Sequence, residues 1–276
     1  MRTLHVDCGR EMQGGQWQVL YLVERLGDVE LLARGPVLEE AERRGVDVWL
    51  FSLAMLLRRT RKFDLVHAHD ARAHTMAMIA GGAPLVVSRR VGFQVRSRWK
   101  YRRADRLLAV SNFVAARLSD AGIDKSKIRT VHDGVILPAK TSMRETGRVV
   151  ALASKPVAIP GIQIHLTTNL LDDLQTASVF VYRSEMEGLG SAALAAQAAG
   201  VPVVASNVGG LAEAIEHERT GLLVDNDNFE PAIRRLLANP KEAEDMGLRG
   251  RERVEKNFTV DLMVERTKAV YQEILR

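Results

Sequence analysis

The sequence predicts an α/β protein with parallel sheets and helices on both sheet faces, arranged as two domains. Short runs rich in Val, Ile and Leu alternate with longer stretches whose apolar residues recur at helical spacing, which is the pattern of parallel sheets. The chain has 276 residues, enough for two domains. It is 46% hydrophobic and 26% charged, a composition typical of soluble globular proteins, which excludes disordered and collagen-like classes.

Seven apolar runs in the first half are predicted strands. They are Thr3–Val6, Val29–Ala33, Val46–Phe51, Asp64–Ala68, Pro84–Val87, Arg106–Val110 and Arg129–His132. Helices are predicted between several of them, for example over Gln18–Leu26 and Asn112–Ala121. The second of these helices has Ser111 as its N-cap and Gly122 just past its end.

The second half continues the alternation. Leu166, Leu170, Leu174 and Ala177 share one helical face and are predicted to lead into a strand. The strands predicted from there on are Val179–Tyr182, Val201–Ala205 and Thr220–Val224. The first two predicted helices are Gly190–Ala199 and Leu211–Glu218. The next is an amphipathic helix marked by Phe229, Ile233, Leu236 and Leu237. Two more helices close the chain, and the last has one apolar stripe, formed by Met263, Thr267, Val270, Tyr271 and Ile274.

The linker is predicted at Asp133–Gly147, which has turn residues and no sustained period. We therefore expect an N-terminal domain over 1–137, a C-terminal domain over 148–258, and a last helix over 259–276. The charge is uneven: up to Lys140 there are 24 Lys+Arg and 15 Asp+Glu, against 15 and 19 afterwards. Such a split fits two units with different partners, or an uneven solvated surface.

The sequence points to a cytoplasmic protein. Cys8 is its only cysteine, so no intrachain disulfide can form. The first residues, MRTLHVDCGREM, lack the charged-then-apolar pattern of a secretory signal. The longest apolar stretch, Val48–Leu57, is about half of what spans a bilayer.

Two segments of the first half carry candidate binding chemistry. Gly14-Gly15, between the first strand and the first helix, lets backbone N–H groups approach a phosphate, although a plain tight turn explains the pair equally well. The glycines do not fit G-x-G-x-x-G, which argues against a nicotinamide cofactor. In HAHDARAH, His67 and His69 lie on one face of a strand that ends there, and we expect hydrogen-bonded histidines that line a cleft rather than metal ligands.

The segment Arg89–Arg106 is strongly basic. Its 18 residues hold eight cations, one carboxylate and three aromatic side chains. As a helix it would place Arg96, Lys100 and Arg103 on one face with Trp99 beside it. This suits an anionic lipid surface or a phosphorylated acceptor, and also nucleic acid, which we rank below both. A solvated basic face is the alternative.

The most informative segment is Val179–Asp225. A predicted strand ends in a loop with Glu187, followed by Gly188-Leu189-Gly190-Ser191 at a helix start, where free N–H groups would hold a diphosphate. A carboxylate is unfavourable beside an anion unless it has another task. Glu187 accepts hydrogen bonds only, so binding sugar hydroxyls is a suitable task.

This segment resembles the donor-sugar domain of the family 4 retaining glycosyltransferases of the GT-B fold. The matching residues are Ser184, Glu187-Gly188-Leu189-Gly190, Leu194, Ala196, Gly200, Pro202-Val203-Val204-Ala205, Gly209-Gly210, Glu213 and Thr220-Gly221-Leu222-Leu223-Val224. The first half is similar to the family as well, at Gly14-Gly15, at DLVHAHD and over Ala104–Val135.

The resemblance implies two Rossmann-like domains facing across a cleft, with the last helix returning to the first domain. It implies a nucleotide-diphosphate sugar as donor, no metal and no other cofactor, because helix N-termini and basic side chains stabilise the leaving diphosphate. Glu187 would contact the transferred sugar. The donor-binding residues would be Gly14, Gly15, Lys155, Gly188, Leu189, Gly190 and Ser191.

The sequence departs from the family pattern at two positions and in one region. The second motif glutamate, which normally holds the ribose, is Ala195. The family's histidine after the fifth strand is matched by Arg90, which cannot be a base at neutral pH but can hold an anion. The start of the second domain, between Val149 and Leu166, is shortened, and Lys155 is the remaining candidate from the basic pair of that region.

We therefore expect a glycosyltransferase that moves a sugar, with retention at the anomeric carbon, to a glycan, lipid-linked or small-molecule acceptor. Glu187 and Arg90 are its candidate catalytic residues. Arg96, Trp99, Lys100 and Arg103 would face the acceptor or an anionic membrane at the inner face. The alternative is a non-catalytic relative that binds a nucleotide, a glycan or a partner enzyme, and the shortened domain leaves an oligomer open.

Overall fold

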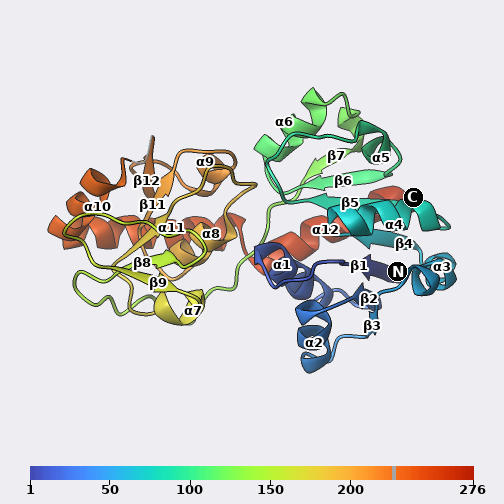
Figure 1. The fold of residues 1–276 in the computed structure, drawn as a ribbon, viewed down its shortest axis with the longest axis horizontal. Helices are drawn as coiled ribbons and strands as arrows, with labels where there is room; N and C mark the ends of the chain where they lie inside the picture. Colours follow the sequence, from blue (N-terminus) through green and yellow to red (C-terminus); the bar gives the residue numbers. More distant parts are fainter. Residues whose placement is uncertain (226–227) are drawn as a thin grey trace. The chain divides into compact units, whose positions relative to one another are not determined.

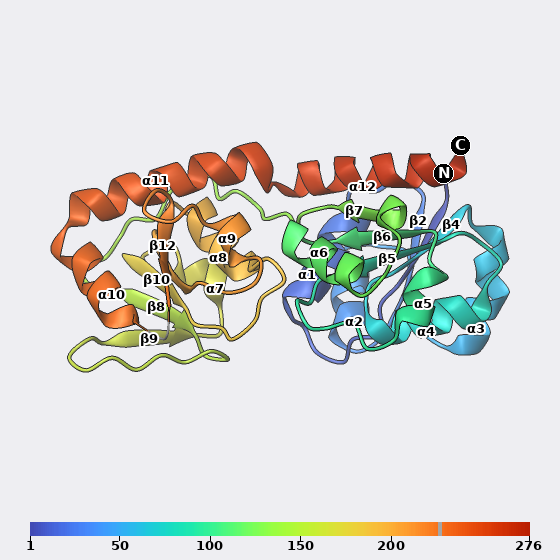
Figure 2. The ribbon, with the colours of Figure 1, turned by 90° about the horizontal axis from the view of Figure 1, so that it is seen from above.

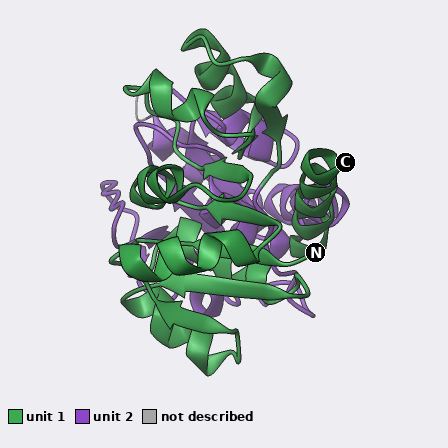
Figure 3. Ribbon diagram, turned by 90° about the vertical axis from the view of Figure 1, so that its right-hand side faces the viewer, with its two compact units in different colours: residues 1–132, 260–276 green, residues 133–259 purple. Residues whose placement is uncertain are grey.

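A computed structural model describes residues 1–225 and 228–276, and the chain divides into two compact units. Unit 1 consists of Met1–His132 and Val260–Arg276, and unit 2 of Asp133–Thr259 (Figure 3). Each unit has its own parallel sheet, so the predicted α/β class is confirmed. Among the described residues, no helix is long and apolar enough to cross a membrane.

The sheet of unit 1 has seven strands in the order β3-β2-β1-β4-β5-β6-β7, all paired in parallel (Figure 1). The strands are β1 (Thr3–Val6), β2 (Val29–Ala33), β3 (Val48–Leu50), β4 (Leu65–Ala68), β5 (Leu85–Arg89), β6 (Arg106–Ala109) and β7 (Ile128–Thr130). β1 lies between β2 and β4, and its register places His5 opposite His67. Loops that follow β1, β4 and β5 therefore meet at one edge of the sheet.

The helices of unit 1 are α1 (Gly14–Val23), α2 (Pro36–Arg43), α3 (Leu53–Arg59), α4 (Ala71–Ala80), α5 (Arg98–Arg102), α6 (Asn112–Asp120) and α12 (Val260–Leu275). α1 and α12 contact each other and pack on the same sheet face (Figure 2), where Leu22, Leu65, Val264 and Tyr271 share one core. Burial of such apolar side chains is the main stabilising term of this layer.

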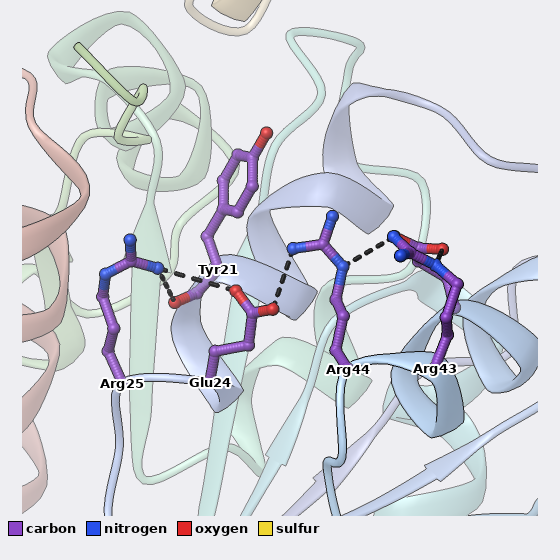
Figure 4. Close-up of polar contacts among 6 residues, drawn as sticks. Tyr21, Glu24, Arg25, Arg43 and Arg44 are labelled. Atoms are coloured by element: carbon purple, nitrogen blue, oxygen red, sulfur yellow. Dashed lines mark hydrogen bonds and ion pairs between the residues drawn. The ribbon is translucent and has the colours of Figure 1, made fainter. Parts of the chain in front are cut away.

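A chain of ion pairs joins α1 to α2 on the surface of unit 1 (Figure 4). Glu24, at the end of α1, accepts a hydrogen bond from Arg44 Nη1 at 2.8 Å, and Arg44 Nε donates to Glu40 at 2.6 Å. Arg25 donates to the carbonyl of Tyr21 at 3.4 Å. Ion pairs at protein surfaces contribute about 0–1 kcal/mol each, so these half-buried pairs orient α2 more than they stabilise it.

The sheet of unit 2 has five parallel strands in the order β12-β11-β10-β8-β9. The strands are β8 (Val149–Leu152), β9 (Ile164–Thr167), β10 (Val179–Tyr182), β11 (Val203–Ser206) and β12 (Gly221–Val224). The helices are α7 (Leu170–Asp173), α8 (Ser191–Ala198), α9 (Leu211–Ala214), α10 (Phe229–Ala238) and α11 (Pro240–Asn257). α8 packs closely on α11, since a Cβ at Gly247 would lie 1.9 Å from the carbonyl oxygen of Gly200.

Most predicted elements are present, and two predictions in unit 2 are wrong. Leu166 belongs to strand β9 rather than to a helix, because the chain pairs there with β8, and the helix α7 is only four residues long. The predicted helix Leu211–Glu218 ends at Ala214, where Ile215 turns to extended backbone. In the first half, Ser111 is confirmed as the N-cap of α6, since its hydroxyl accepts from the backbone N–H of Val114.

Candidate functional site

The loop between β10 and α8 holds Glu187 in a dense hydrogen-bond arrangement. The Tyr182 hydroxyl donates to Glu187 Oε1 at 2.8 Å, and the Ser184 hydroxyl donates to the same oxygen at 3.0 Å. Lys155, just after β8, forms an ion pair with that oxygen and also donates to Ser184 Oγ at 2.9 Å. Two strands thus bring a basic and an acidic side chain together at one end of the sheet.

The electrostatics of this group keep its donors protonated. Tyr182 is 5% exposed, and its burial, followed by the neighbouring Glu187 charge and hydrogen bond, raises the pKa of its phenol. Tyr182 is therefore a hydrogen-bond donor at every ordinary pH. Three donors fill Glu187 Oε1, whereas within residues 1–225 and 228–276 no hydrogen bond or ion pair reaches Oε2. The second oxygen is available to a ligand.

The backbone around Glu187 is fixed by the glycine pair after β11. Gly209 has a φ of +57°, and a Cβ there would lie 2.2 Å from the carbonyl oxygen of Glu187. That same oxygen accepts a hydrogen bond from the N–H of Gly210 at 3.1 Å. Only glycine permits this approach, so the two glycines hold the loop that presents the carboxylate.

The N-terminus of α8 follows directly. Gly188, Leu189 and Gly190 are buried and Ser191 is half-buried, and Gly190, with a φ of +98°, is the N-cap without a side-chain cap. An uncapped helix start offers N–H groups to an anion. Ala195 lies one turn further along α8, half-buried, where a carboxylate would be needed to bind ribose hydroxyls.

In unit 1, the ends of β1, β4 and β5 meet at the start of α1. Gly14 and Gly15 are the first two residues of α1, not a separate loop. Arg90, which follows β5, lies next to Gly15, since its Cδ would be 3.7 Å from a Cβ at that residue. Asp70 caps α4 and accepts from the Cys8 N–H at 2.5 Å, which ties the loops after β4 and β1 together.

Three histidines lie beneath this corner. His5, His67 and His69 are buried, so the expectation that His67 and His69 line a cleft is wrong. His5 Nδ1 is 2.9 Å from His69 Nε2, and His67 lies between the hydroxyls of Ser88 (2.8 Å) and Tyr271 (2.5 Å). Burial lowers the pKa of His5 to about 3 and those of His67 and His69 well below the ordinary value.

The described part of the chain has one group with metal-ligand spacing, and it is these histidines, whose nitrogens lie within 4.8 Å of one another. Their hydrogen bonds favour a structural role over metal binding. Both nitrogens of His67 already have hydroxyl partners, and Arg90 Nη1 lies 3.3 Å from His69 Nδ1. A metal on His69 Nε2 requires a proton on Nδ1, which would face a guanidinium that can only donate.

The basic segment is arranged differently from its prediction. α5 covers only Arg98–Arg102, so Arg96 lies outside the helix and does not share a face with Lys100. Lys100 is half-buried, donates to the carbonyl of Ala71 at 3.2 Å, and has a pKa lowered by burial, then by Arg89. Arg103 lies over the ring of Trp99, which is 55% exposed.

The structure thus gathers the candidate residues into three groups. One consists of Lys155, Glu187 and the start of α8, the second of Gly14, Gly15 and Arg90, and the third of the exposed side chains around Trp99. Sequence reasoning missed the roles of Tyr182 and His5. In the sequence, each of them is only a polar side chain in an otherwise apolar strand. That pattern does not predict which residue the side chain contacts.

Sequence models of two glycosyltransferase families match this chain. The model described as Glycosyltransferase Family 4 matches residues 17–137, and that of Glycosyl transferases group 1 matches residues 162–253, including the Glu187 loop. The chain belongs to the group 1 and family 4 glycosyltransferases. The resemblance inferred from the motifs is confirmed.

Curated relatives align over part of their length. Over 117 residues the chain is 37% identical to an alpha-maltose-1-phosphate synthase of Mycolicibacterium smegmatis, covering 39% of this chain and 30% of the relative. Over 82 residues it is 43% identical to a GDP-mannose-dependent alpha-(1-6)-phosphatidylinositol monomannoside mannosyltransferase of Mycobacterium tuberculosis, covering 29% and 21%. The chain therefore spans less than a third of either relative.

Solved structures share the fold along the whole chain. HepE of Anabaena, crystallised with UDP-glucose, superposes with a TM-score of 0.84 at 16% identity, covering 99% of this chain and 100% of that one. A glycosyltransferase of Rickettsia africae gives a TM-score of 0.80 at 17% identity, covering 100% and 98%. These similarities establish the GT-B fold of this glycosyltransferase-family chain.

Proposed function

We propose that this protein transfers a sugar from a nucleotide-diphosphate donor to an acceptor hydroxyl, and that unit 2 binds the donor. The observation that carries the proposal is the asymmetric Glu187 carboxylate. Its Oε1 is held by Tyr182, Ser184 and Lys155, so its Oε2 is oriented to accept hydrogen bonds from sugar hydroxyls.

The same loop suits the diphosphate. The N–H groups of Leu189, Gly190 and Ser191 at the start of α8, together with Lys155, would neutralise the charge that develops as the sugar leaves. This chemistry needs no metal. Retention at the anomeric carbon follows in our proposal if the diphosphate leaves on the face where the acceptor attacks. The UDP-glucose bound by HepE and the GDP-mannose named for the mannosyltransferase support a donor of this class.

Lys155 has to change partner when a donor binds. In the structure its ammonium group contacts the Glu187 carboxylate, and a diphosphate offers a stronger anionic partner. Binding would then transfer Lys155 from Glu187 to phosphate while Tyr182 and Ser184 keep the carboxylate in place. The pair therefore keeps both charges compensated until the donor arrives.

For unit 1 we propose a phosphate-binding role of Gly14, Gly15 and Arg90, and an anionic membrane or lipid-linked acceptor as partner. Leu53–Arg106 contains 13 Lys+Arg and 3 Asp+Glu. Each carboxylate is already engaged with a backbone N–H inside the unit; these residues are Asp64, Asp70 and Asp105, which accept from Arg2, Cys8 and Leu85. The outer charge of this region is therefore almost entirely positive.

Apolar side chains are exposed among these cations. α4 contacts both α3 and α5 (Figures 1 and 2), and these helices with the loop before α5 form what we call the basic face. Its exposed apolar residues are Leu53, Leu57, Ile79, Phe93 and Trp99. Apolar groups interspersed with Arg and Lys are typical of surfaces that bind anionic bilayers. Location at an inner membrane face remains part of this proposal.

Titration of the whole chain with UDP, GDP and ADP, at matched salt, tests the donor site. Micromolar binding of one of them, with release of that nucleotide from its sugar conjugate in the presence of an acceptor extract, would support the transferase. Binding without release would support the second candidate, a non-catalytic relative that binds a nucleotide. Ala195 favours this candidate, because its methyl group cannot accept a hydrogen bond from a ribose hydroxyl. Absence of binding to any of the three, in a folded sample, would contradict both.

A further inference from the structure

Arg90 is held from the interior side by a histidine. Arg90 Nη1 lies 3.3 Å from His69 Nδ1, while its Cδ lies next to Gly15, at 3.7 Å from the position of a Cβ there. The arginine side chain thus links a buried imidazole to the residue that opens α1. An arginine otherwise has many rotamers, and ordering it for a ligand costs free energy.

The direction of the hydrogen bond follows from the chemistry of arginine. A guanidinium group carries donors only and stays protonated. His69 Nδ1 is therefore the acceptor, and a neutral His69 carries its proton on Nε2. That proton is directed at His5 Nδ1, 2.9 Å away, so His5 in turn carries its proton on Nε2. One tautomer of each ring satisfies both contacts.

Burial keeps this arrangement neutral. His5 is fully buried and His69 is 6% exposed, so desolvation lowers both pKa values, and the charge of Arg90 adds to the effect. The titratable and charged groups that act on His69 are His5, His67 and Arg90. Because burial lowers the pKa of both rings, Nδ1 of His69 stays an acceptor at neutral pH.

We propose that His69, fixed in its Nε2–H tautomer by His5, is a positioning residue that holds the Arg90 guanidinium beside Gly15 so that it can bind a phosphate group of the substrate. The inference rests on the proposed function, because it assumes a nucleotide-diphosphate substrate.

The first experiment reads the tautomer in the wild-type chain. Long-range ¹⁵N–¹H spectra of imidazole-labelled protein distinguish Nδ1–H from Nε2–H in each of the seven histidines. We expect His69 and His5 both as Nε2–H between pH 8 and 6, with the His69 signals shifted in Arg90→Leu. An Nδ1–H tautomer at His69 would overturn the proposal, because its Nδ1 could not then accept from Arg90.

The second experiment measures the consequence for ligand binding. For whichever of UDP, GDP and ADP binds best, we expect Arg90→Leu and His69→Leu each to weaken affinity roughly tenfold, the effect of losing one charge-assisted contact. The double variant should lose no more than either single one, since His69 acts through Arg90. His69→Asn should restore binding to within about threefold, because its Oδ1 can accept where Nδ1 did.

The outcomes separate the inference from the proposed function. If the wild type binds none of the three nucleotides, the proposed function fails, and the nitrogen spectra still decide whether His69 accepts from Arg90. If the wild type binds but His69→Leu, checked for its folded state by circular dichroism, binds equally well, the positioning role is overturned. Additive losses in the double variant would overturn it as well.

Discussion

The two units orient their candidate site residues by opposite means. In unit 2, a carboxylate is held by surrounding donors, and a lysine partly compensates its charge. In unit 1, a cation contacts His69, one ring of a buried and hydrogen-bonded histidine pair. The first arrangement lies in a partly exposed loop and depends on a charge pair, whereas the second depends on histidines staying unprotonated. The two arrangements should therefore be disrupted under different conditions.

Lowering the pH should produce the largest difference in stability between the two units. An unfolded histidine protonates near pH 6.5, whereas His5 in the folded state does so only near pH 3. Between these values the unfolded chain binds more protons, so the free energy of unfolding falls as pH falls, by up to about 1.4 kcal/mol per pH unit for each buried histidine. Burial also lowers the pKa values of His67 and His69, so they act in the same direction and unit 1 should lose stability more steeply than one histidine alone would cause.

Urea unfolding at pH 7.5 and 5.5, followed by hydrogen exchange in each unit, would measure this. The control is His165→Gln, which removes a half-exposed histidine of unit 2 and should leave the pH dependence of unit 1 unchanged. Equal acid sensitivity of the two units would contradict the comparison.

Glu187→Gln should reduce turnover with little loss of fold. The amide keeps the shape but loses the charge, and we expect release of the nucleoside diphosphate to slow roughly a hundredfold. Glu187→Ala is less informative than Glu187→Gln, because it removes a carboxylate that three side chains contact and leaves Lys155 without its ion-pair partner. Glu185→Gln, two residues earlier and exposed, is the matched control and should retain full turnover.

Gly209→Ala should destabilise unit 2 and weaken nucleotide binding. The left-handed φ alone costs about 1–2 kcal/mol for alanine. The added Cβ would also displace the Glu187 carbonyl, for about 2 kcal/mol more. Gly147→Ala separates the two effects, since Gly147 has a φ of +79° in the same unit but open space around it. Equal losses in thermal stability and affinity would show that the contact with Glu187 is unimportant.

Substitutions on the basic face should have the smallest effect. We expect Leu57→Glu to weaken sedimentation with phosphatidylcholine vesicles containing 30% phosphatidylglycerol by about fivefold, with a strong salt dependence. Leu248→Glu is the control, since Leu248 is exposed to a similar degree in unit 2. Equal binding to vesicles of pure phosphatidylcholine would contradict an electrostatic membrane partner.

The sequence predicted the elements whose signals are local. β1, β2 and β10 have the predicted bounds because a buried parallel strand is a short apolar run between turn residues. The helix predicted through Leu166 is wrong, since its apolar spacing also fits a strand at the sheet edge and only pairing with β8 decides between them. Short segments of this kind depend on tertiary contacts.

For the candidate site, motifs located the loops but not their internal contacts. Lys155 was selected by resemblance, and the ion pair with Glu187 joins residues from two different strand ends. His5 approaches His69 across the paired strands β1 and β4. Contacts between residues far apart in sequence follow from strand order, which periodicity does not reveal. The Arg96 and Lys100 prediction was wrong for a related reason, since α5 begins at Arg98.

The discontinuity of unit 1 has a consequence for how the protein folds during synthesis. Unit 2 is a continuous stretch of chain, but the core of unit 1 is closed by α12, whose Tyr271 contacts His67 from 204 residues away. On the ribosome, unit 2 can complete its fold before unit 1 has all its parts. Until Val260–Leu275 emerge, the apolar side chains of the seven-stranded sheet that pack on α12 lie uncovered, and transiently exposed apolar surface of this kind favours aggregation.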